Sequence, residues 1–274
     1  MLFRPHPVVR GGNFQTLFSA IYPWRRALLA GKQRLVDLDD GDRLMLHDDK
    51  PRRWRPEDRS ALLVHGLGGS HASPYIELAA KKLLDQGVRT FRLDLRGCGA
   101  GEAYARGAAH CGSWPDVAAA VEHVAEVAPR SPLHLIGYSL GGSLALNLAG
   151  EIGDKPCGNL ASVLAVCPPV DLHELDRAFS RGAGRVYSRH YCRLMWRHIL
   201  SRLSSMEDPP EVDTSRVPRS IRELDEQITA PFHGYSSADH YYTHASAGQR
   251  LSGVRVPTKV IAAADDPVIP VRSF

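Results

Sequence analysis

The 274-residue sequence predicts an α/β fold, in which helices cover both faces of a mostly parallel sheet. Short continuous apolar runs alternate along the chain with helical stretches of about a dozen residues, a pattern typical of right-handed βαβ crossovers. Hydrophobic residues make up 43% and charged residues 23% of the chain, which is the balance of a globular protein. No apolar run approaches the roughly 18 residues of a membrane-spanning helix, and the N-terminus lacks the apolar core of a signal peptide. We therefore expect a cytoplasmic protein.

Residues 1–34 form a basic arm ahead of the predicted domain, which spans residues 35–274. The arm holds six Lys or Arg residues and no Asp or Glu, although the net charge of the chain is only +4. We expect the arm to pack on the domain with its arginines in water; peripheral contact with an acidic membrane is the alternative. The small net charge and the lack of a recognised module argue against nucleic acid as a partner. The apolar and aromatic residues of the arm are Phe14, Leu17, Phe18, Ile21, Tyr22 and Trp24, and they are followed by Arg25 and Arg26.

The elements follow in order from hydrophobic periodicity. Two alternating segments, 34–40 and 42–49, flank the Asp40-Gly41 turn and predict a β-hairpin. After a polar loop the pattern changes to apolar runs of the kind that strands buried on both faces require. Such strands are expected at residues 61–64, 88–95, 133–136, 160–167 and 258–263, and the helices between the first four at residues 74–86, 114–127 and 140–151.

Residues 168–257 break this alternation and predict a helical lid inserted into the domain. Arginines recur there at every fourth position, a spacing that places them along one face of a helix. Gly182 and Gly184 are expected to interrupt this helix. A solvated face is the expected explanation, and a lid that attracts anionic substrate headgroups is the alternative. The arginines are Arg177, Arg181, Arg185, Arg189, Arg193 and Arg197.

The strongest chemical signal is the hexapeptide GYSLGG at residues 137–142, between a predicted strand and a predicted helix. A strand that turns abruptly into a helix exposes the residue at the bend, and the flanking glycines leave room for close backbone segments. We therefore expect Ser139 to be a nucleophile at the N-terminus of a helix. There the backbone N–H of Leu140 and the helix dipole favour a developing oxyanion.

A serine nucleophile needs a second oxyanion donor, a histidine base and an acid that orients the base. The segment HGLGG at residues 65–69 follows a predicted strand, and we expect the N–H of Leu67 to point at the same oxyanion as that of Leu140. A phosphate-binding loop is the competing interpretation, but no Lys-Ser/Thr pair follows and no GxGxxG is present. His65 is expected to shape the turn rather than to act as the base.

The acid is expected late in the chain, where the segment AAADDPVIP at residues 262–270 begins at the end of a predicted strand. Open α/β sheets collect functional groups at the carboxyl ends of their strands. The spacing to Pro270 favours Asp266, and Asp265 is the alternative. Either aspartate also fits a purely turn-forming role before a proline.

These motifs together resemble the α/β-hydrolase superfamily and, within it, the YheT-like branch that includes mammalian abhydrolase-domain esterases. The resemblance covers nearly the whole chain. It implies an α/β-hydrolase fold, hydrolysis of carboxylic esters without a metal or organic cofactor, Ser139 as nucleophile and Asp266 as acid. The motifs are GNFQT (12–16), HGLGGS (65–70), DLRGCG (94–99), GYSLGG (137–142), IRELD (221–225), TAPFHGY (229–235), Tyr241-Tyr242 and Asp265-Asp266-Pro267.

The sequence departs from this pattern at the histidine base. The order of the triad in this fold is Ser, acid, His, and no histidine follows Asp266. We expect the chain to be a C-terminally truncated hydrolase that lacks its last strand, the loop with the base and the closing helix, which would leave apolar surface exposed on the strand near residues 256–263. A relocated base is the less favoured explanation, because its imidazole must reach Ser139 from the correct side. The histidines considered for that role are His110, His233, His240 and His244.

The sequence therefore predicts a serine hydrolase that cleaves short-chain or monoacylglycerol-type esters through an acyl-enzyme. Without its base the chain is expected to be weakly active or inactive. The alternative is a non-catalytic module that binds lipids or anions in the same pocket. The five cysteines are widely spread without a CxxC pair, so free thiols are expected rather than a disulfide framework or a zinc site.

Overall fold

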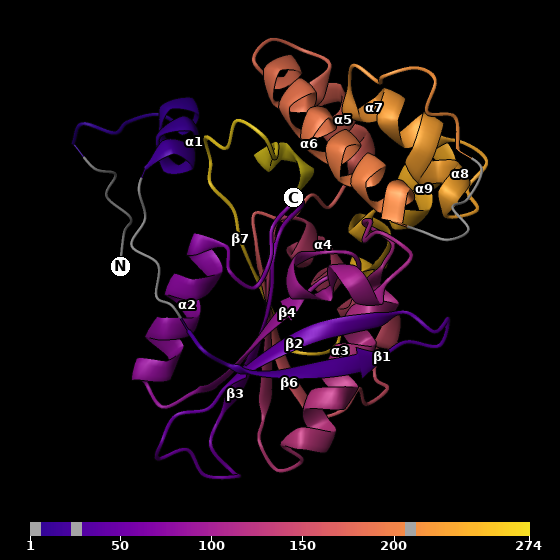
Figure 1. The fold of residues 1–274 in the computed structure, drawn as a ribbon. Coiled ribbons are helices and arrows are strands. Elements are labelled where there is room, and N and C mark those ends of the chain that lie inside the picture. The colour runs from indigo at the N-terminus through magenta and orange to yellow at the C-terminus, as the bar shows by residue number, and fades with distance from the viewer. Residues whose placement is uncertain (1–6, 23–28, 206–211) are drawn as a thin grey trace.

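The computed structural model describes residues 7–22, 29–205 and 212–274. In these residues seven strands form one sheet in the order β1-β2-β4-β3-β5-β6-β7, with helices on both faces (Figure 1). The pairings of β2 with β1 and β4 are antiparallel, and the other four are parallel. The predicted α/β class is therefore confirmed. The strands are β1 (Lys32–Asp37), β2 (Arg43–Asp49), β3 (Ser60–Val64), β4 (Arg89–Asp94), β5 (Leu133–Tyr138), β6 (Leu160–Val166) and β7 (Thr258–Ile261).

The predicted hairpin is present, and Gly41 has the positive φ, 85°, that its turn requires. Strand β5 extends two residues beyond the predicted end at residue 136. The reason is that Gly137 and Tyr138 still pair with Ala165 and Val166 of the neighbouring β6, which local hydrophobicity does not reveal. The sheet therefore continues up to the residue before Ser139.

Three helices complete the α/β units: α2 (Pro74–Asp85), α3 (Trp114–Val127) and α4 (Leu140–Ile152). Successive side chains of a strand point to opposite faces of the sheet. Leu62 of β3 accordingly packs in one cluster with Val121 of α3 and Leu144 of α4. Its neighbour Leu63 packs in another with Ile76 of α2. Helices α3 and α4 thus cover one face of the sheet and α2 covers the other.

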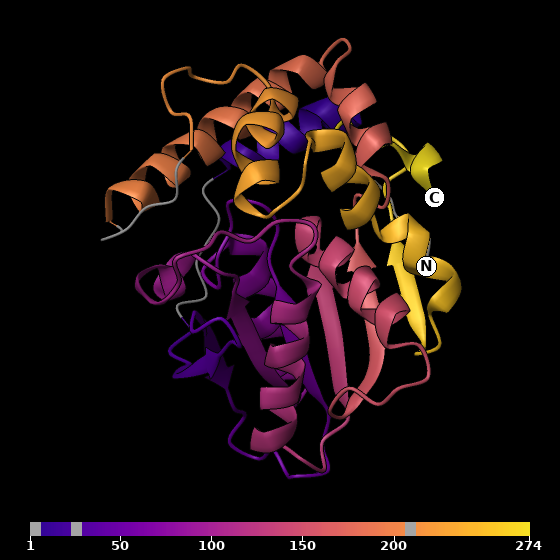
Figure 2. The same cartoon turned by 90° about the vertical axis from the view of Figure 1, so that its right-hand side faces the viewer.

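Between β6 and β7 the described residues form helices and loops but no strand, and we call the helices between residues 172 and 245 the cap. The cap is a layer of helices on one side of the sheet, above the strand ends in Figure 2. Its α-helices are α5 (Leu172–Phe179), α6 (Gly184–Ser205), α7 (Ile221–Leu224), α8 (Ala230–Phe232) and α9 (Ala238–Ala245). Short turns complete the secondary structure: the 3-10 helices η1 (Gly99–Tyr104), η3 (Ala247–Gly253) and η4 (Val271–Ser273), and the π-helical turn η2 (Asp225–Thr229).

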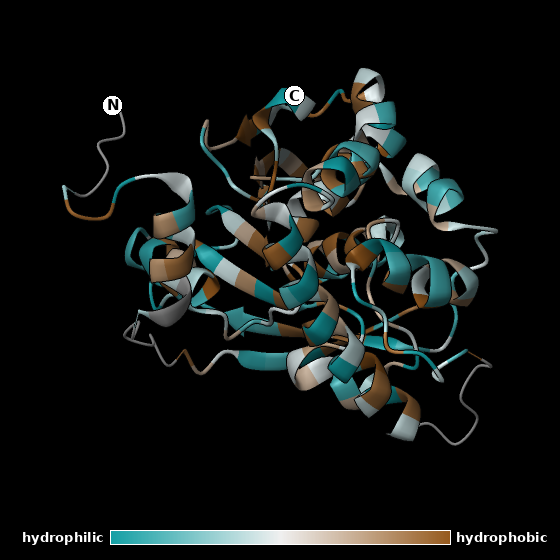
Figure 3. Cartoon of the chain, turned by 90° about the horizontal axis from the view of Figure 1, so that it is seen from above, coloured by the Kyte–Doolittle hydropathy of each residue, from teal (hydrophilic) through white to brown (hydrophobic). Residues whose placement is uncertain are grey.

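The arginine stripe lies mostly on α6. The predicted interruption is present: Gly182, with a φ of 46°, lies between α5 and α6, and Gly184 is the first residue of α6. The arginines of the stripe on α6 are all exposed, and the helices of the chain carry both hydrophilic and hydrophobic residues in Figure 3. The stripe is therefore a solvated helix face. Its exposed arginines on α6 are Arg185, Arg189, Arg193 and Arg197.

The N-terminal arm contributes helix α1 (Gly12–Ile21), which packs against both the cap and the C-terminal segment. The hydroxyl of Tyr187 on α6 donates a hydrogen bond of 3.0 Å to Asn13 Oδ1, and Gly12 lies against the carbonyl of Asp265. Phe14 and Leu17 stay half exposed. Trp24, Arg25 and Arg26 lie outside the described residues. Among the helices that the structure describes, none is long and apolar enough to cross a bilayer.

Strand β7 forms one edge of the sheet. It pairs with β6 on one side, and the described residues place no strand on its other side. Two of its apolar side chains are exposed, Val260 at 40% and Ile261 at 48%. An exposed apolar edge strand is a site for pairing with further chain or for aggregation, as the sequence predicted for this strand.

Candidate active site

Ser139 lies at the bend between β5 and α4. Its φ of 51° and ψ of −116° are a strained combination for a residue with a side chain. Two hydrogen bonds hold the bend: the N–H of Ser139 donates to the carbonyl of Val166 (2.8 Å), and the N–H of Ser143 donates to the carbonyl of Ser139 (3.0 Å). The strain is therefore maintained by β6 and by the first turn of α4, and the serine side chain is presented at the carboxyl end of the sheet.

The glycines of GYSLGG are required by the close approach of backbone segments. A Cβ on Gly137 would overlap the carbonyl of Gly141, and a Cβ on Gly141 would lie 2.5 Å from the carbonyl oxygen of Val64. Gly66 is also close, because a Cβ there would lie 3.1 Å from the Cβ of Ser139. The bend thus sits against the end of β3 and the start of the glycine-rich loop.

Ser139 shares one cavity with the two expected oxyanion donors, Leu67 and Leu140. Leu140 is the first residue of α4, so its N–H has no partner within the helix. Within the described part of the chain, the N–H of Leu67 donates no hydrogen bond to another backbone group. The structure therefore brings the serine and both proposed donors to the same cavity.

His65 has the structural role that the sequence indicated. It is buried, its Nδ1 lies 2.8 Å from the carbonyl of Gly66, and its Nε2 accepts the N–H of Leu95 at 3.1 Å. Burial lowers the pKa of this imidazole, so the neutral form that these contacts need is favoured. His65 ties the glycine-rich loop to the end of β4.

Asp266 follows the carboxyl end of β7, and Ser139 follows the carboxyl end of β5 at the same end of the sheet. One carboxylate oxygen, Oδ1, accepts the N–H groups of Val268 and Ile269, both at 2.9 Å. Those two residues line the cavity of Ser139, whereas Asp266 itself is not among the lining residues. Its carboxylate is close to Cys167, whose thiol pKa is raised by burial and further by this negative charge. Asp265, the alternative acid, is exposed.

The described residues place no imidazole within hydrogen-bond distance of the Ser139 hydroxyl. His110 lines the same cavity, but its ring stacks on His233 with the centroids 3.9 Å apart, and its Nδ1 accepts the N–H of Gly112 at 3.2 Å. His240 and His244 contact each other on α9 and do not line the cavity. None of the four histidines considered as a relocated base is therefore arranged to act on Ser139.

The stacked pair has a consequence for stability at acidic pH. Burial and then the positive charge of Arg96 lower the pKa of His233 to about 4, and burial lowers that of His110 as well. The unfolded chain binds protons near pH 6.5, so these neutral imidazoles are expected to cost the folded state stability as the pH falls from about 6.5 to about 4.

We expect His233→Phe, which keeps a ring against His110, to reduce this loss by up to about 1.4 kcal/mol per pH unit. The measurement is the free energy of unfolding in urea at pH 7 and pH 5 for both proteins. Burial raises the pKa of Asp225 to about 6, so this carboxyl adds to the stability of the folded state as the pH falls. This contribution is the same in the parent and in His233→Phe and cancels in the comparison. If the free energies of unfolding of the two proteins differ by the same amount at pH 7 and at pH 5, the prediction is wrong.

The cavity has a volume of about 570 Å³ and is mostly apolar. The sheet side contributes residues around Ser139, the cap contributes many of the others, and Ser19 of α1 and Val268 and Ile269 after β7 also line the cavity. Sequence reasoning missed this lining because the motifs of the cap were quoted only for the family resemblance and were given no part in a pocket. The apolar and aromatic cap residues in it include Leu172, Leu175, Phe179, Tyr191, Met195, Ile221, Leu224, Tyr241 and Tyr242.

Two polar residues of the cavity were also missed. The hydroxyl of Tyr75 accepts the N–H of Gly66 at 2.9 Å and so fixes the loop next to Leu67; in the sequence it is an unremarked position of a predicted helix. Asp225 is buried and accepts a hydrogen bond of 2.8 Å from the hydroxyl of Tyr242. Its signal in the sequence was its place in the IRELD motif, without an assigned role.

The fold and the serine at its bend define a class of protein. The profile of the alpha/beta hydrolase family matches residues 61–274, and the chain belongs to this family. Two solved structures share the fold with low sequence identity: the 2,6-dihydroxy-pseudo-oxynicotine hydrolase (TM-score 0.53, 19% identity, 85% of this chain and 52% of that one) and an esterase of Pyrococcus furiosus (TM-score 0.52, 16% identity, 90% and 74%).

Among curated proteins, the chain is 30% identical over 259 residues to the YheT esterase of Escherichia coli (strain K12), covering 93% of this chain and 75% of that protein. It is also 26% identical to a monoacylglycerol lipase of Saccharomyces cerevisiae, over 76% of this chain and 48% of that protein. It is 30% identical to phospholipase ABHD3 of Mus musculus, over 75% of this chain and 50% of that protein. The predicted YheT-like branch is thus confirmed. The chain spans three quarters of the first relative and about half of the other two.

Proposed function

We propose that this chain carries the catalytic core of a serine esterase that cleaves carboxylic esters through an acyl-enzyme. The observation that supports it most is the strained bend that presents Ser139 to an apolar cavity. Beside it are the N–H groups of Leu67 and Leu140, which donate no hydrogen bond to another backbone group in the described part of the chain. Family membership and the names of the relatives support hydrolysis in general. The serine mechanism and the ester class are the proposal.

In this mechanism Ser139 Oγ attacks the ester carbonyl and releases the alcohol, and water then hydrolyses the acyl-enzyme. The N–H groups of Leu67 and Leu140 stabilise the oxyanion, a contribution of about 3 kcal/mol for each donor in comparable sites. Asp266 orients the histidine that takes the serine proton. Among the described residues no histidine reaches Ser139, and without such a base little of the rate acceleration is expected. The 274-residue chain alone is expected to be weakly active.

The substrate class that we infer is short-chain or monoacylglycerol-type esters. A cavity of about 570 Å³ with an apolar lining accommodates an acyl chain of modest length. Relatives named monoacylglycerol lipase and phospholipase support lipid esters as substrates. All five cysteines are unpaired, which is consistent with the reducing cytoplasm as the location.

The second candidate function is a non-catalytic module that binds lipids or anions. Two observations favour it: the absence of an imidazole at Ser139 among the described residues and the exposed arginines of α6. Retention of a fatty acid or anionic lipid by the intact gene product, without turnover of any ester, would support this function.

The experiment that tests the proposal is labelling of the intact gene product with a fluorophosphonate probe, followed by peptide mass spectrometry. We expect the label on Ser139, its loss in Ser139→Ala, and unchanged labelling in Ser236→Ala, which alters an exposed cap serine. A folded intact protein that takes up no probe would exclude the serine mechanism and leave the binding module.

A further inference from the structure

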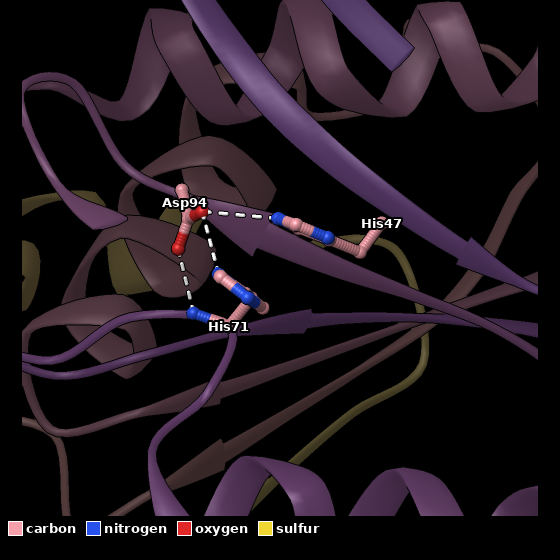
Figure 4. Close-up of side chains that lie close together, drawn as sticks. All are labelled: His47, His71 and Asp94. Atoms are coloured by element: carbon pink, nitrogen blue, oxygen red, sulfur yellow. Dashed lines mark hydrogen bonds and ion pairs between the residues drawn. The ribbon is translucent and has the colours of Figure 1, made fainter. Parts of the chain in front are cut away.

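Three side chains that are distant in the sequence form a buried polar cluster outside the cavity of Ser139. His47 comes from β2, His71 follows the glycine-rich loop, and Asp94 is the last residue of β4 (Figure 4). One potential ligand atom from each residue lies within 4.8 Å of the other two. None of the three lines the cavity of Ser139, so the cluster is separate from the proposed catalysis.

The two imidazoles converge on one oxygen of Asp94. His71 Nδ1 lies 2.7 Å and His47 Nε2 lies 3.1 Å from Oδ2, and the two rings stack with their centroids 3.5 Å apart. The N–H of Ala100 also donates to Oδ2 at 2.9 Å, while the backbone N–H of His71 donates to Oδ1 at 2.6 Å. The backbone bonds fix the carboxylate independently of the imidazoles.

The surroundings of the Asp94 carboxylate suit a bound cation. The side chain of Asp94 is fully buried, and among the described residues it forms no ion pair with a lysine or an arginine. The guanidinium of Arg92, on the same strand, pairs with Asp49 instead. Among the described residues the side-chain partners of this buried carboxylate are the two imidazoles, and a cation bound between the three groups would compensate its charge.

We propose that His47, His71 and Asp94 bind a divalent transition-metal ion, for which zinc is the best match. Two imidazole nitrogens and one carboxylate oxygen are a common protein ligand set for zinc. The His71 side chain is 22% exposed while those of His47 and Asp94 are 5% and 0% exposed. An ion and a water molecule as fourth ligand therefore enter from the side of His71.

Binding requires a small and specific rearrangement. Ligand atoms about 2.0–2.1 Å from a tetrahedral zinc ion lie about 3.3 Å from one another, so the present 2.7 Å and 3.1 Å contacts open by a few tenths of an ångström. The stacked rings must splay so that their nitrogen lone pairs meet at the ion. Each neutral imidazole then carries its single proton on the other ring nitrogen.

The bound ion would connect β2, β4 and the glycine-rich loop. His71 lies four residues after Leu67, so the ion would restrict the segment that carries the proposed oxyanion donor. We therefore assign it a structural role, which does not depend on the esterase activity. A structural ion is expected to raise the Tm of the protein, so binding can be followed by thermal unfolding as well as by metal content.

The test uses untagged protein that has been stripped with a chelator and then dialysed against Zn²⁺ or Co²⁺. Bound metal is measured by mass spectrometry, and the coordination geometry by the visible absorption of Co²⁺. The informative variant is His47→Gln/His71→Asn, whose amide N–H groups keep the hydrogen bonds to Asp94 without the imidazole ligands. His240→Gln/His244→Gln is the matched control, because that pair on α9 is another adjacent imidazole pair with surface access.

We expect one equivalent of zinc in the parent protein and in the control, and affinity at least about tenfold weaker in His47→Gln/His71→Asn. Zinc at 100 times the Kd of the parent should raise the Tm of the parent by about 5 °C or more and that of the variant by no more than about half as much. Equal zinc content in parent and variant, loss of zinc only in the control, or no retained metal at all would overturn the proposal and leave a hydrogen-bonded cluster.

Discussion

Replacing Asp266 by asparagine is expected to lower the kcat for ester hydrolysis about ten-thousand-fold in the intact gene product. An acid of this kind holds the histidine base in the correct tautomer, and an amide in its place presents the wrong hydrogen-bonding pattern. The backbone bonds from Val268 and Ile269 to Oδ1 can still be made by the asparagine carbonyl oxygen. The variant should therefore fold, and kcat should fall without a comparable loss of stability.

The matched control is Asp265→Asn. This neighbouring carboxylate is exposed, so its replacement should change kcat by no more than a few-fold. Steady-state kinetics with a short-chain nitrophenyl ester and thermal unfolding of all three proteins provide the measurements. If Asp265→Asn is the inactive variant, the assignment of the acid is wrong; if both retain activity, neither aspartate serves the base.

Replacing Gly137 by alanine is expected to destabilise the fold by more than about 3 kcal/mol. A Cβ at this position would overlap backbone atoms of Gly141 and Gly142, which belong to the first turn of α4 and cannot rotate away as a side chain can. Relief requires α4 to move away from β5 in the centre of the molecule. The measurement is the urea-induced unfolding transition.

Gly182→Ala provides the comparison for this variant. Gly182 has a positive φ of 46°, but no atom lies within 4 Å of the position that an added methyl group would take, so alanine there costs only the conformational strain, about 1–2 kcal/mol. A loss of stability in Gly137→Ala no larger than in Gly182→Ala would show that the bend tolerates a side chain and that the close approach at Gly137 is not required.

The sequence allowed much of the fold to be predicted because the relevant signals are local. The apolar run at residues 61–64 indicated a strand buried on both faces, and β3 is buried at every position. The glycines around Ser139 indicated a tight bend, and the bend has the positive φ expected of it. The edge position of β7 and its exposed apolar side chains were also anticipated.

Contacts between side chains on different helices, strands and loops could not be predicted from the sequence. The histidines at positions 110 and 233 were considered separately as bases, and the structure stacks them on each other. Tyr75 occupies an ordinary position of a helix in the sequence, whereas in the structure its hydroxyl accepts a hydrogen bond from the N–H of Gly66. Each of these contacts joins residues that lie on different elements, so no periodicity in one segment could reveal them.

The sequence by itself determined the succession of strands and helices, the bend at Ser139 and the family, because periodicity, glycine sterics and motif spacing are properties of neighbouring residues. Only the tertiary structure decided that cap side chains enclose the cavity and that His47, His71 and Asp94 meet. The physical reason is the strand order. Strand β2 pairs with β4, which brings His47 and Asp94 to adjacent strands, and such long-range pairing follows from burying both faces of the whole sheet.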